Sequence, residues 1–400
     1  MSAELIQFLC ILAAVASGWL IGYFYRPKWR HAKKNDDNAS SYYKGLNYLL
    51  SEQAGAAVMT VINELPVNIE TLPTHLALGN LMRSKGEVDG AIRIHQNLLS
   101  RPSLPRDKLY QVHLELARDY ISAGLLDRAE RLLRDVVDES AIYRMDALEH
   151  LQNIYQSEKE WDQAIAVARL RLPQRSWLKK QAVLTATERA VECSLSHYHC
   201  EKAKPLLLAS DVKAASKELQ LARNYDGNNV RAYLLSADLA ISQNKPQQAL
   251  NLLHSVIDRQ PAFASEVVPI FRKAFLGFAN QAAYLDALQR AAQKTSSTAF
   301  NIECAQVMAE CKGQELALQF LHEVALQRPT FGLLSEVLNK PEGERRQGGA
   351  LVRQLLDQLK AERPVYRCRH CGFSGQKLHW LCPSCEQWGT IAPIRGILGD

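Results

Sequence analysis

Four cysteines near the C-terminus are the residues of this sequence best suited to chemistry. They form two C-x-x-C pairs, Cys368 with Cys371 and Cys382 with Cys385, separated by ten residues. Each pair can present two thiolates from one tight turn to a single ion, and four thiolates complete a tetrahedral shell. His370 could also coordinate a metal, but four sulfurs leave no position for it. We therefore predict Cys368, Cys371, Cys382 and Cys385 as the ligands of one metal ion.

A closed shell of four thiolates limits what this site can do. It leaves no open position for water or substrate, so the site is structural or electron-carrying rather than hydrolytic. Zinc and iron both accept this geometry, and the residues do not choose between them. The domain around these cysteines is too small to fold by itself, and it carries three apolar aromatic side chains that can pack elsewhere: Phe373, Trp380 and Trp388. We expect it to pack against the last helical repeats or against a helix over residues 349–363.

The rest of the chain carries no motif for catalysis. His197, His199 and Cys200 lie close together in sequence, but residues two apart on a helix point to different sides, so we expect no shared metal site there. Four further cysteines are paired seven residues apart, which predicts core thiols on helix faces: Cys193 with Cys200 and Cys304 with Cys311. There is no Gly-rich phosphate loop, nucleophile elbow or H-E-x-x-H motif. We predict that the protein is not an enzyme.

Composition and charge describe a folded chain in a reducing compartment. Of the 400 residues, 47% are apolar and 22% charged, so the chain can bury a core. The net charge is +6, but a short segment after the first hydrophobic run holds five basic residues, Arg26, Lys28, Arg30, Lys33 and Lys34. The remaining chain is nearly balanced, which gives no electrostatic support to a nucleic-acid groove. Four of the nine cysteines cluster near the C-terminus and the other five are scattered, which is not the dense pattern of a secreted disulfide scaffold.

The N-terminal segment has the length and composition of a membrane-spanning helix. Residues 5–25 contain no charge, and only Gln7 and Ser17 are clearly polar. The basic segment follows this run, so the positive-inside rule places everything after residue 26 in the cytoplasm. A cleaved signal peptide would need the opposite charge order and a shorter apolar core. Ala14, Gly18 and Gly22 form a small-residue face that would permit a homodimer or contact with a partner helix.

The middle of the chain repeats with a period of about 34 residues. The anchor is an alanine expected near the start of the second helix of each helical pair: Ala57, Ala91, Ala129, Ala164, Ala215, Ala249, Ala287 and Ala317. A small residue usually lies twelve positions earlier, as at Gly79 and Ala117, and turn signals such as Gly86 and Gly124 lie between the two. One interval, from Ala164 to Ala215, is 51 residues long and holds an extra helical stretch over residues 177–193. Pro205 should kink a helix or mark its first turn.

This pattern resembles the tetratricopeptide repeat, a helix–turn–helix unit. Small residues let the two helices of a pair touch, and each pair must stack on the next to cover its apolar face. The stacked array has a long surface suited to binding a segment of another protein. The fold prediction is therefore an all-α superhelix with a membrane helix (residues 1–26), a basic and polar linker (27–41), tetratricopeptide repeats (42–340), a linking helix (341–363) and a rubredoxin-like or zinc-ribbon-like metal domain (364–400).

Together, the predicted membrane helix, the helical repeats and the C-terminal four-cysteine module closely resemble the lipopolysaccharide assembly protein B family of Gram-negative bacteria. The resemblance covers essentially the whole chain and is sharpest at Leu78-Gly79-Asn80-Leu81, at Gly124 to Ala129 and over the last 35 residues. It is weakest over residues 173–215. In that family the terminal module is described as rubredoxin-type, which implies iron, and its four ligands match the four cysteines predicted above.

The resemblance implies a regulatory role at the inner membrane. The family helps the membrane protease FtsH to degrade LpxC, the deacetylase that commits precursor to lipid A synthesis, and it coordinates lipopolysaccharide assembly with other proteins of that process. An adapter of this kind brings two proteins together and does not itself catalyse a reaction. Two alternatives stay open from the residues alone: a rubredoxin-like electron carrier, and a general repeat chaperone for enzymes of envelope biosynthesis.

Overall fold

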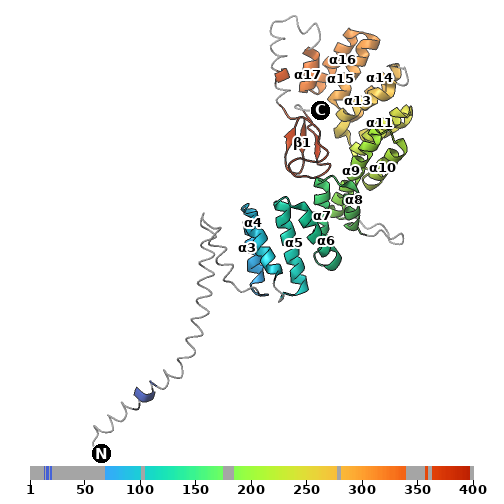
Figure 1. Cartoon of the computed structure of the whole chain (residues 1–400). Helices are drawn as coiled ribbons and strands as arrows, with labels where there is room; N and C mark the ends of the chain where they lie inside the picture. The colour runs from blue at the N-terminus through green and yellow to red at the C-terminus, as the bar shows by residue number, and fades with distance from the viewer. Residues whose placement is uncertain are drawn as a thin grey trace, which may run out of the picture. The chain divides into compact units, whose positions relative to one another are not determined.

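The computed structural model describes residues 68–100, 104–173, 184–276, 281–338, 356–358 and 363–396, together with positions 13, 15–17 and 19. The chain divides into two compact units, Met1–Ile154 and Tyr155–Asp400. In both units, most of the described residues lie in helices joined by short turns (Figure 1).

Unit 1 is built from two complete helix pairs and the start of a third. Its elements are α3 (Leu72–Ser84), α4 (Val88–Leu99), α5 (Arg106–Ser122), α6 (Leu126–Glu139) and most of α7 (Arg144–Ser157). Leu72 and Leu76 of α3 pack with Leu98 of α4 and Val112 of α5 in one buried cluster. The first helix of each pair therefore contacts both its own partner and the first helix of the next pair, as stacking requires.

Unit 2 continues the pairs and adds the metal domain. Its helices are α8 (Trp161–Leu170), α9 (Ala186–Leu208), α10 (Val212–Tyr225), α11 (Val230–Ser242), α12 (Pro246–Arg259), the short η1 (Pro261–Phe263), α13 (Ala264–Leu276), α14 (Gln281–Thr295), α15 (Thr298–Lys312), α16 (Gln314–Gln327) and α17 (Phe331–Leu338). A buried cluster of this unit runs from Val230 of α11 to Ala317 of α16 and includes Ala392 of the metal domain.

The alanine anchors lie where the repeat pattern predicts. Within the described residues they fall in the second helices of the pairs, at Ala91, Ala129, Ala164, Ala215, Ala249, Ala287 and Ala317. Ala287 is 6% exposed and the other six are fully buried. A larger side chain at these positions would push the two helices apart, which explains why a methyl group recurs there. This confirms the helical-hairpin prediction for the described part of the array; Ala57 lies outside it.

Five of the described turns between paired helices contain a residue in the left-handed backbone region. In unit 1 these are Gly86 (φ 85°) and Gly124 (φ 73°), which the sequence identified. In unit 2 the same position is taken by Lys159, Ser210 and Asn244, with φ between 57° and 61°. Because left-handed conformations disfavour most side chains, only the glycines were visible as turn signals in the sequence.

The long interval in the repeat is partly accounted for by a long first helix. Helix α9 runs for 23 residues and begins with a capping box, in which Thr185 and Glu188 each accept a hydrogen bond from the other's backbone N–H. The extra helix predicted over residues 177–193 thus corresponds to the start of α9 from Ala186 onward, and residues 174–183 lie outside the described part. Pro205 lies in the last turn of α9, not in a first turn.

The metal domain is a small antiparallel sheet with two cysteine turns. Strand β1 (Tyr366–Cys368) lies between β2 (Ser374–Gly375) and β3 (Ile391–Pro393). Tyr366 pairs with Gly375 on one side and with Pro393 on the other. The central position of β1 brings the first cysteine turn next to the chain segment that follows the second.

Several predicted segments lie outside the described residues. They are most of the membrane helix (1–26), the linker (27–41), the start of the array, and nearly all of the linking helix (341–363). The five described positions of the N-terminal segment are helical. Within the part of the chain that the structure describes, no helix combines the length and the apolar character needed to cross a bilayer.

Candidate metal centre

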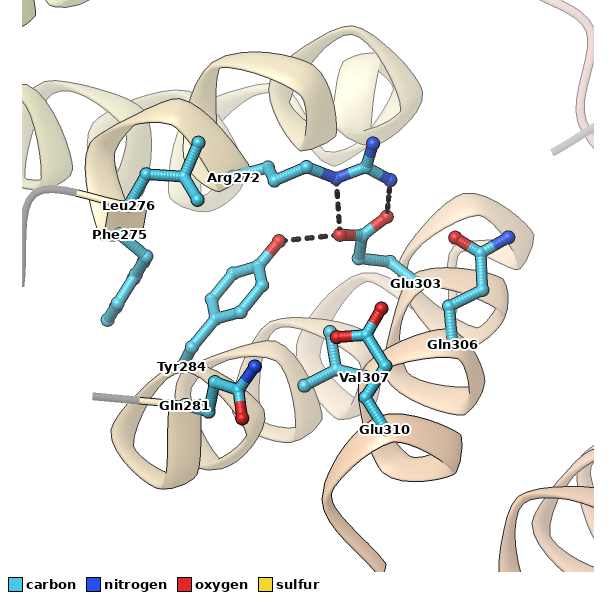
Figure 2. Close-up of a pocket in the computed structure, with 9 residues that line it drawn as sticks. All are labelled: Arg272, Phe275, Leu276, Gln281, Tyr284, Glu303, Gln306, Val307 and Glu310. Carbon is cyan, nitrogen blue, oxygen red and sulfur yellow. Dashed lines mark hydrogen bonds and ion pairs between the residues drawn. The ribbon is translucent and has the colours of Figure 1, made fainter. Parts of the chain in front are cut away.

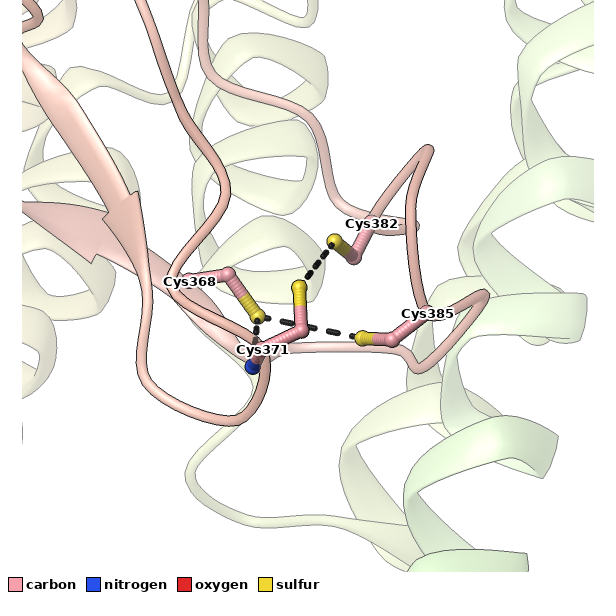
Figure 3. Close-up of side chains that lie close together, drawn as sticks. All are labelled: Cys368, Cys371, Cys382 and Cys385. Carbon is pink, nitrogen blue, oxygen red and sulfur yellow. Dashed lines mark hydrogen bonds between the residues drawn. The ribbon is translucent and has the colours of Figure 1, made fainter.

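The four predicted ligands lie together in space. The sulfurs of Cys368, Cys371, Cys382 and Cys385 are all within 4.8 Å of one another (Figure 3). Cys368 Sγ is 3.8 Å from Cys385 Sγ, and Cys371 Sγ is 3.6 Å from Cys382 Sγ. These separations are far longer than a disulfide bond, so the thiols are free.

The sulfur spacing fits a tetrahedral metal shell. Four sulfurs bound at 2.3 Å to one ion lie about 3.8 Å apart, close to the two separations in this structure. A bound ion would cross-link the two turns, and four thiolates around it would leave no position for water. Zinc and iron fit this spacing equally well, because both accept four thiolates in a tetrahedron.

Local backbone geometry aims the sulfurs inward. Cys368 ends β1, and the chain then turns so that Cys371 faces back toward it. The residue after each second cysteine, Gly372 and Glu386, has a positive φ of 81° and 53° respectively. The two C-x-x-C turns therefore have the same local form, although only the first carries the glycine that favours it.

Hydrogen bonds in the first turn favour the thiolate of Cys368. Burial acts to raise its pKa, but the backbone N–H groups of Cys371 and His370 point at the sulfur, 3.5 and 3.4 Å away, and the Thr390 hydroxyl lies 3.3 Å from it. The net result lowers the pKa of Cys368 to about 6. The backbone N–H of Phe373 chiefly lowers the pKa of Cys371, whereas burial raises that of Cys385 to about 12. A metal ion would have to displace the proton from Cys385.

His370 takes no place in the sulfur cluster. Its Nε2 atom lies 3.4 Å from Nε2 of Gln387, and its contribution to the site is the backbone N–H on Cys368. This agrees with the prediction that four sulfurs suffice.

Trp388 anchors the metal domain to the repeats of unit 2. It lies three residues after Cys385 and is 8% exposed. Its indole stacks on His197 of α9, and its Nε1–H donates to Gln156 Oε1 of α7 at 2.7 Å. The Arg231 guanidinium of α11 lies 5.9 Å from the indole ring. Trp388 thus contacts three successive first helices of the array.

Further contacts extend this interface to α13 and α14. The Tyr366 hydroxyl donates to Glu266 at 2.5 Å, Trp380 stacks on Phe263, and Arg395 donates to the Thr295 carbonyl. The sequence predicts packing against the last repeats or against a helix over residues 349–363. Within the described residues, the contacts join the metal domain to helices between Gln156 of α7 and Thr295 of α14 (Figure 1), and most of residues 349–363 lie outside the described part.

Several residues of this interface were missed by the sequence analysis. Gln156, Arg231 and Glu266 are ordinary polar residues of amphipathic helices, and nothing local marks them as partners of a segment a hundred or more residues away. His197 had been considered only as a metal ligand. It is 2% exposed, and burial holds the pKa of its imidazole well below the usual value of 6.5, with the nearby Arg231 acting in the same direction.

The remaining cysteines are mostly core thiols, as predicted. Cys200 and Cys304 are buried and Cys193 is half-buried, and burial raises the pKa of each to about 12. Cys311 contradicts the prediction because it is exposed, with Sγ 3.5 Å from Gln281 Oε1.

Comparisons with known proteins match both parts of the chain. Residues 366–393 match the family described as rubredoxin metal binding domain, and residues 74–109 match a tetratricopeptide repeat family. The chain is 31% identical over 399 residues to lipopolysaccharide assembly protein B of Escherichia coli (strain K12), covering 98% of both chains. It is also 31% identical over 405 residues to the protein of that name in Haemophilus influenzae, covering 97% of both.

These matches join the repeat array and the four-cysteine module in one protein of the same length. A relative at this identity over nearly the whole of both sequences establishes common membership. The chain belongs to the lipopolysaccharide assembly protein B family.

Proposed function

We propose that this chain is a non-catalytic adapter in lipopolysaccharide assembly, held at the inner membrane with its repeats and metal domain in the cytoplasm. The observation that carries the proposal is the full-length match to relatives named for lipopolysaccharide assembly. The closed sulfur cluster and the helical repeats support a role in holding proteins together, because repeats of this kind present extended binding surfaces.

The adapter would act by promoting the degradation of LpxC by the membrane protease FtsH. A protease confined to the membrane meets a soluble substrate rarely. A scaffold that binds both and shares the membrane with the protease raises their effective concentration to roughly the millimolar range. The hydrophobic run over residues 5–25 and the basic segment after it support this placement.

The experiment compares LpxC turnover in cells that make either the full chain or the chain without residues 1–26. We expect LpxC to be degraded more slowly with the truncated chain, at equal adapter level, because the substrate is no longer brought to the membrane. Normal turnover with the truncated chain would contradict the tether. A reporter enzyme fused after Asp400 tests the orientation: activity of a periplasmic reporter would contradict the cytoplasmic placement.

A second candidate function is electron transfer by a rubredoxin-type iron centre. The matched family is described as rubredoxin, and the exposed Cys371 would give an electron a path from solvent to the cluster. Metal analysis and visible absorbance of the purified chain separate the two functions. A colourless protein with one zinc ion would end this candidate, whereas a red chromophore that can be reduced and reoxidised would favour it.

A further inference from the structure

A cavity of about 500 Å³ lies between α13, α14 and α15, all in unit 2 (Figure 2). Its residues come from the C-terminal half of α13, the start of α14 and one face of α15. α13 and α15 are first helices of successive pairs.

One wall of the cavity is a preformed polar network. The carboxylate of Glu303 is 4% exposed and accepts the Tyr284 hydroxyl at 2.7 Å and Arg272 Nε at 2.6 Å on one oxygen. Arg272 Nη2 donates to its other oxygen. Both oxygens of Glu303 are thus occupied and its charge is balanced by Arg272, so the wall is rigid and nearly neutral.

Next to this wall lies apolar surface that water still reaches. Leu276 is 75% exposed, Phe275 is half-buried, and Val307 forms the facing part of α15. A leucine left in water at the mouth of a cavity gains stability when another apolar side chain covers it. The cavity can hold a side chain of the size of leucine, because 500 Å³ exceeds what one such group needs.

The rim of the cavity carries one unbalanced charge. Glu303, Gln306 and Glu310 lie three and four residues apart on α15 and so share one face of the helix. Glu310 is exposed and makes no ion pair within the described residues, whereas Glu303 is neutralised by Arg272. The lining therefore has a net charge of about −1 beside an apolar floor, which complements a positive charge next to an apolar group.

We propose that this cavity is a docking site for an extended segment of a partner protein in which an apolar residue stands beside a Lys or Arg. The apolar side chain enters between Leu276 and Val307, and the basic side chain pairs with Glu310. This deepens the adapter function proposed above and rests on it in one respect, that the occupant is a protein.

The test uses the purified full chain in detergent and a synthetic peptide, Gly-Ser-Leu-Lys-Ser-Gly, blocked at both ends and carrying photoreactive leucine. A second peptide has Glu in place of Lys. After illumination, mass spectrometry locates the labelled residues. We expect the basic peptide to label the facing surfaces of α13 and α15, and the acidic peptide to label them about fivefold less, the ratio that one exposed ion pair supports.

Charge reversal at the rim sharpens the test. Glu310→Lys should lower labelling by the basic peptide about fivefold and raise labelling by the acidic one. Glu310 is exposed, so the variant keeps the helical circular dichroism of the parent. The matched control is Glu323→Lys, the same change at an exposed position of α16 outside the cavity.

Three outcomes would overturn the proposal: labelling outside the cavity lining on α13, α14 and α15, equal labelling by both peptides, or the same effect from Glu323→Lys as from Glu310→Lys. The assay needs no cell and no LpxC. The cavity can therefore fail this test while the adapter function stands, and normal LpxC turnover with the truncated chain would leave a positive labelling result intact.

Discussion

The indole of Trp388 stacks on the imidazole of His197, with ring centroids 4.8 Å apart and 17° between the ring planes. The indole belongs to the metal domain, and the imidazole lies in α9, in the middle of the repeat array. Trp161 and Tyr198 meet the same indole edge-on, at centroid distances of 6.5 and 6.0 Å. This aromatic cluster is therefore one apolar link between the cysteine module and the repeats of unit 2, and Ala392 and Trp380 form another.

Replacing Trp388 with alanine should detach the metal domain from the array. Removing a buried tryptophan costs about 3–5 kcal/mol through lost apolar contact and the cavity left behind. Trp388→Phe is the matched control: it keeps a ring on His197 and loses the hydrogen bond to Gln156, at a cost of about 1 kcal/mol. Urea unfolding followed by circular dichroism measures both. An alanine variant that unfolds at the parent's urea concentration would contradict this role.

The buried His197 should make unit 2 less stable in acid. Its folded-state pKa lies well below 6.5, because burial and Arg231 both disfavour the charged ring. Below pH 6.5 the unfolded chain binds a proton at His197 that the folded chain does not. Stability therefore falls as the pH drops through this range, by at most about 1.4 kcal/mol per pH unit.

The measurement is the urea midpoint between pH 5 and pH 7.5 for the parent and for His197→Phe. Phenylalanine keeps the stack on Trp388 but cannot titrate, so the variant should lose this part of the acid slope. Any release of metal in acid affects both proteins alike. Identical slopes would show that His197 does not carry the effect.

Cys382→Ser should remove the metal and loosen the C-terminal domain. Cys382 is fully buried, and its sulfur is one of four that close the shell, so the variant leaves three thiolates and a poorer ligand. We expect metal content to fall from one ion per chain to well below one, with a lower melting temperature, because binding and folding are coupled. Cys311→Ser, an exposed thiol outside the cluster, should change neither quantity. Full metal content in Cys382→Ser would refute the ligand assignment.

Alkylation should separate the cysteines by environment. In chelator-treated protein at pH 7, iodoacetamide should modify Cys371 first, since it is exposed and the Phe373 N–H lowers its pKa. Cys193, Cys200 and Cys304 should resist until the chain unfolds, because burial raises the pKa of each to about 12. Peptide mapping follows each thiol. Rapid modification of Cys304 in folded protein would contradict its placement in the core.

Gly79→Ala should destabilise unit 1. A Cβ at Gly79 would lie 2.4 Å from Nε2 of His95, a fully buried ring held at 2.5 Å by Asp119. Because Arg83 also binds Asp119, the ring cannot move aside cheaply, and we expect a loss of about 1–3 kcal/mol.

Gly90→Ala is the matched control in the next helix. Its new Cβ would meet only the flexible end of Met82, and alanine favours a helix over glycine. Thermal unfolding of both variants gives the comparison. An equal melting temperature for the two would mean that the contact with His95 is not tight.

The local patterns of this protein were readable from its sequence because each depends on neighbours along the chain. The cysteine turns need only two residues between ligands, and the buried alanines Ala91 and Ala249 repeat with the helix pairs. Turns at Lys159 and Ser210 were invisible, because their left-handed backbone is imposed by the packed helices on residues that do not favour it.

Tertiary structure alone decided where the metal domain binds and where the cavity opens. Trp388 donates a hydrogen bond to Gln156, which is 232 residues away in the sequence. Tyr284 and Arg272 both donate to Glu303 because their three helices converge. Such contacts depend on how successive helix pairs stack. Hydrophobic periodicity shows that a helix face is buried but does not show which partner covers it, so residue spacing predicted the ligands of this protein and not its interfaces.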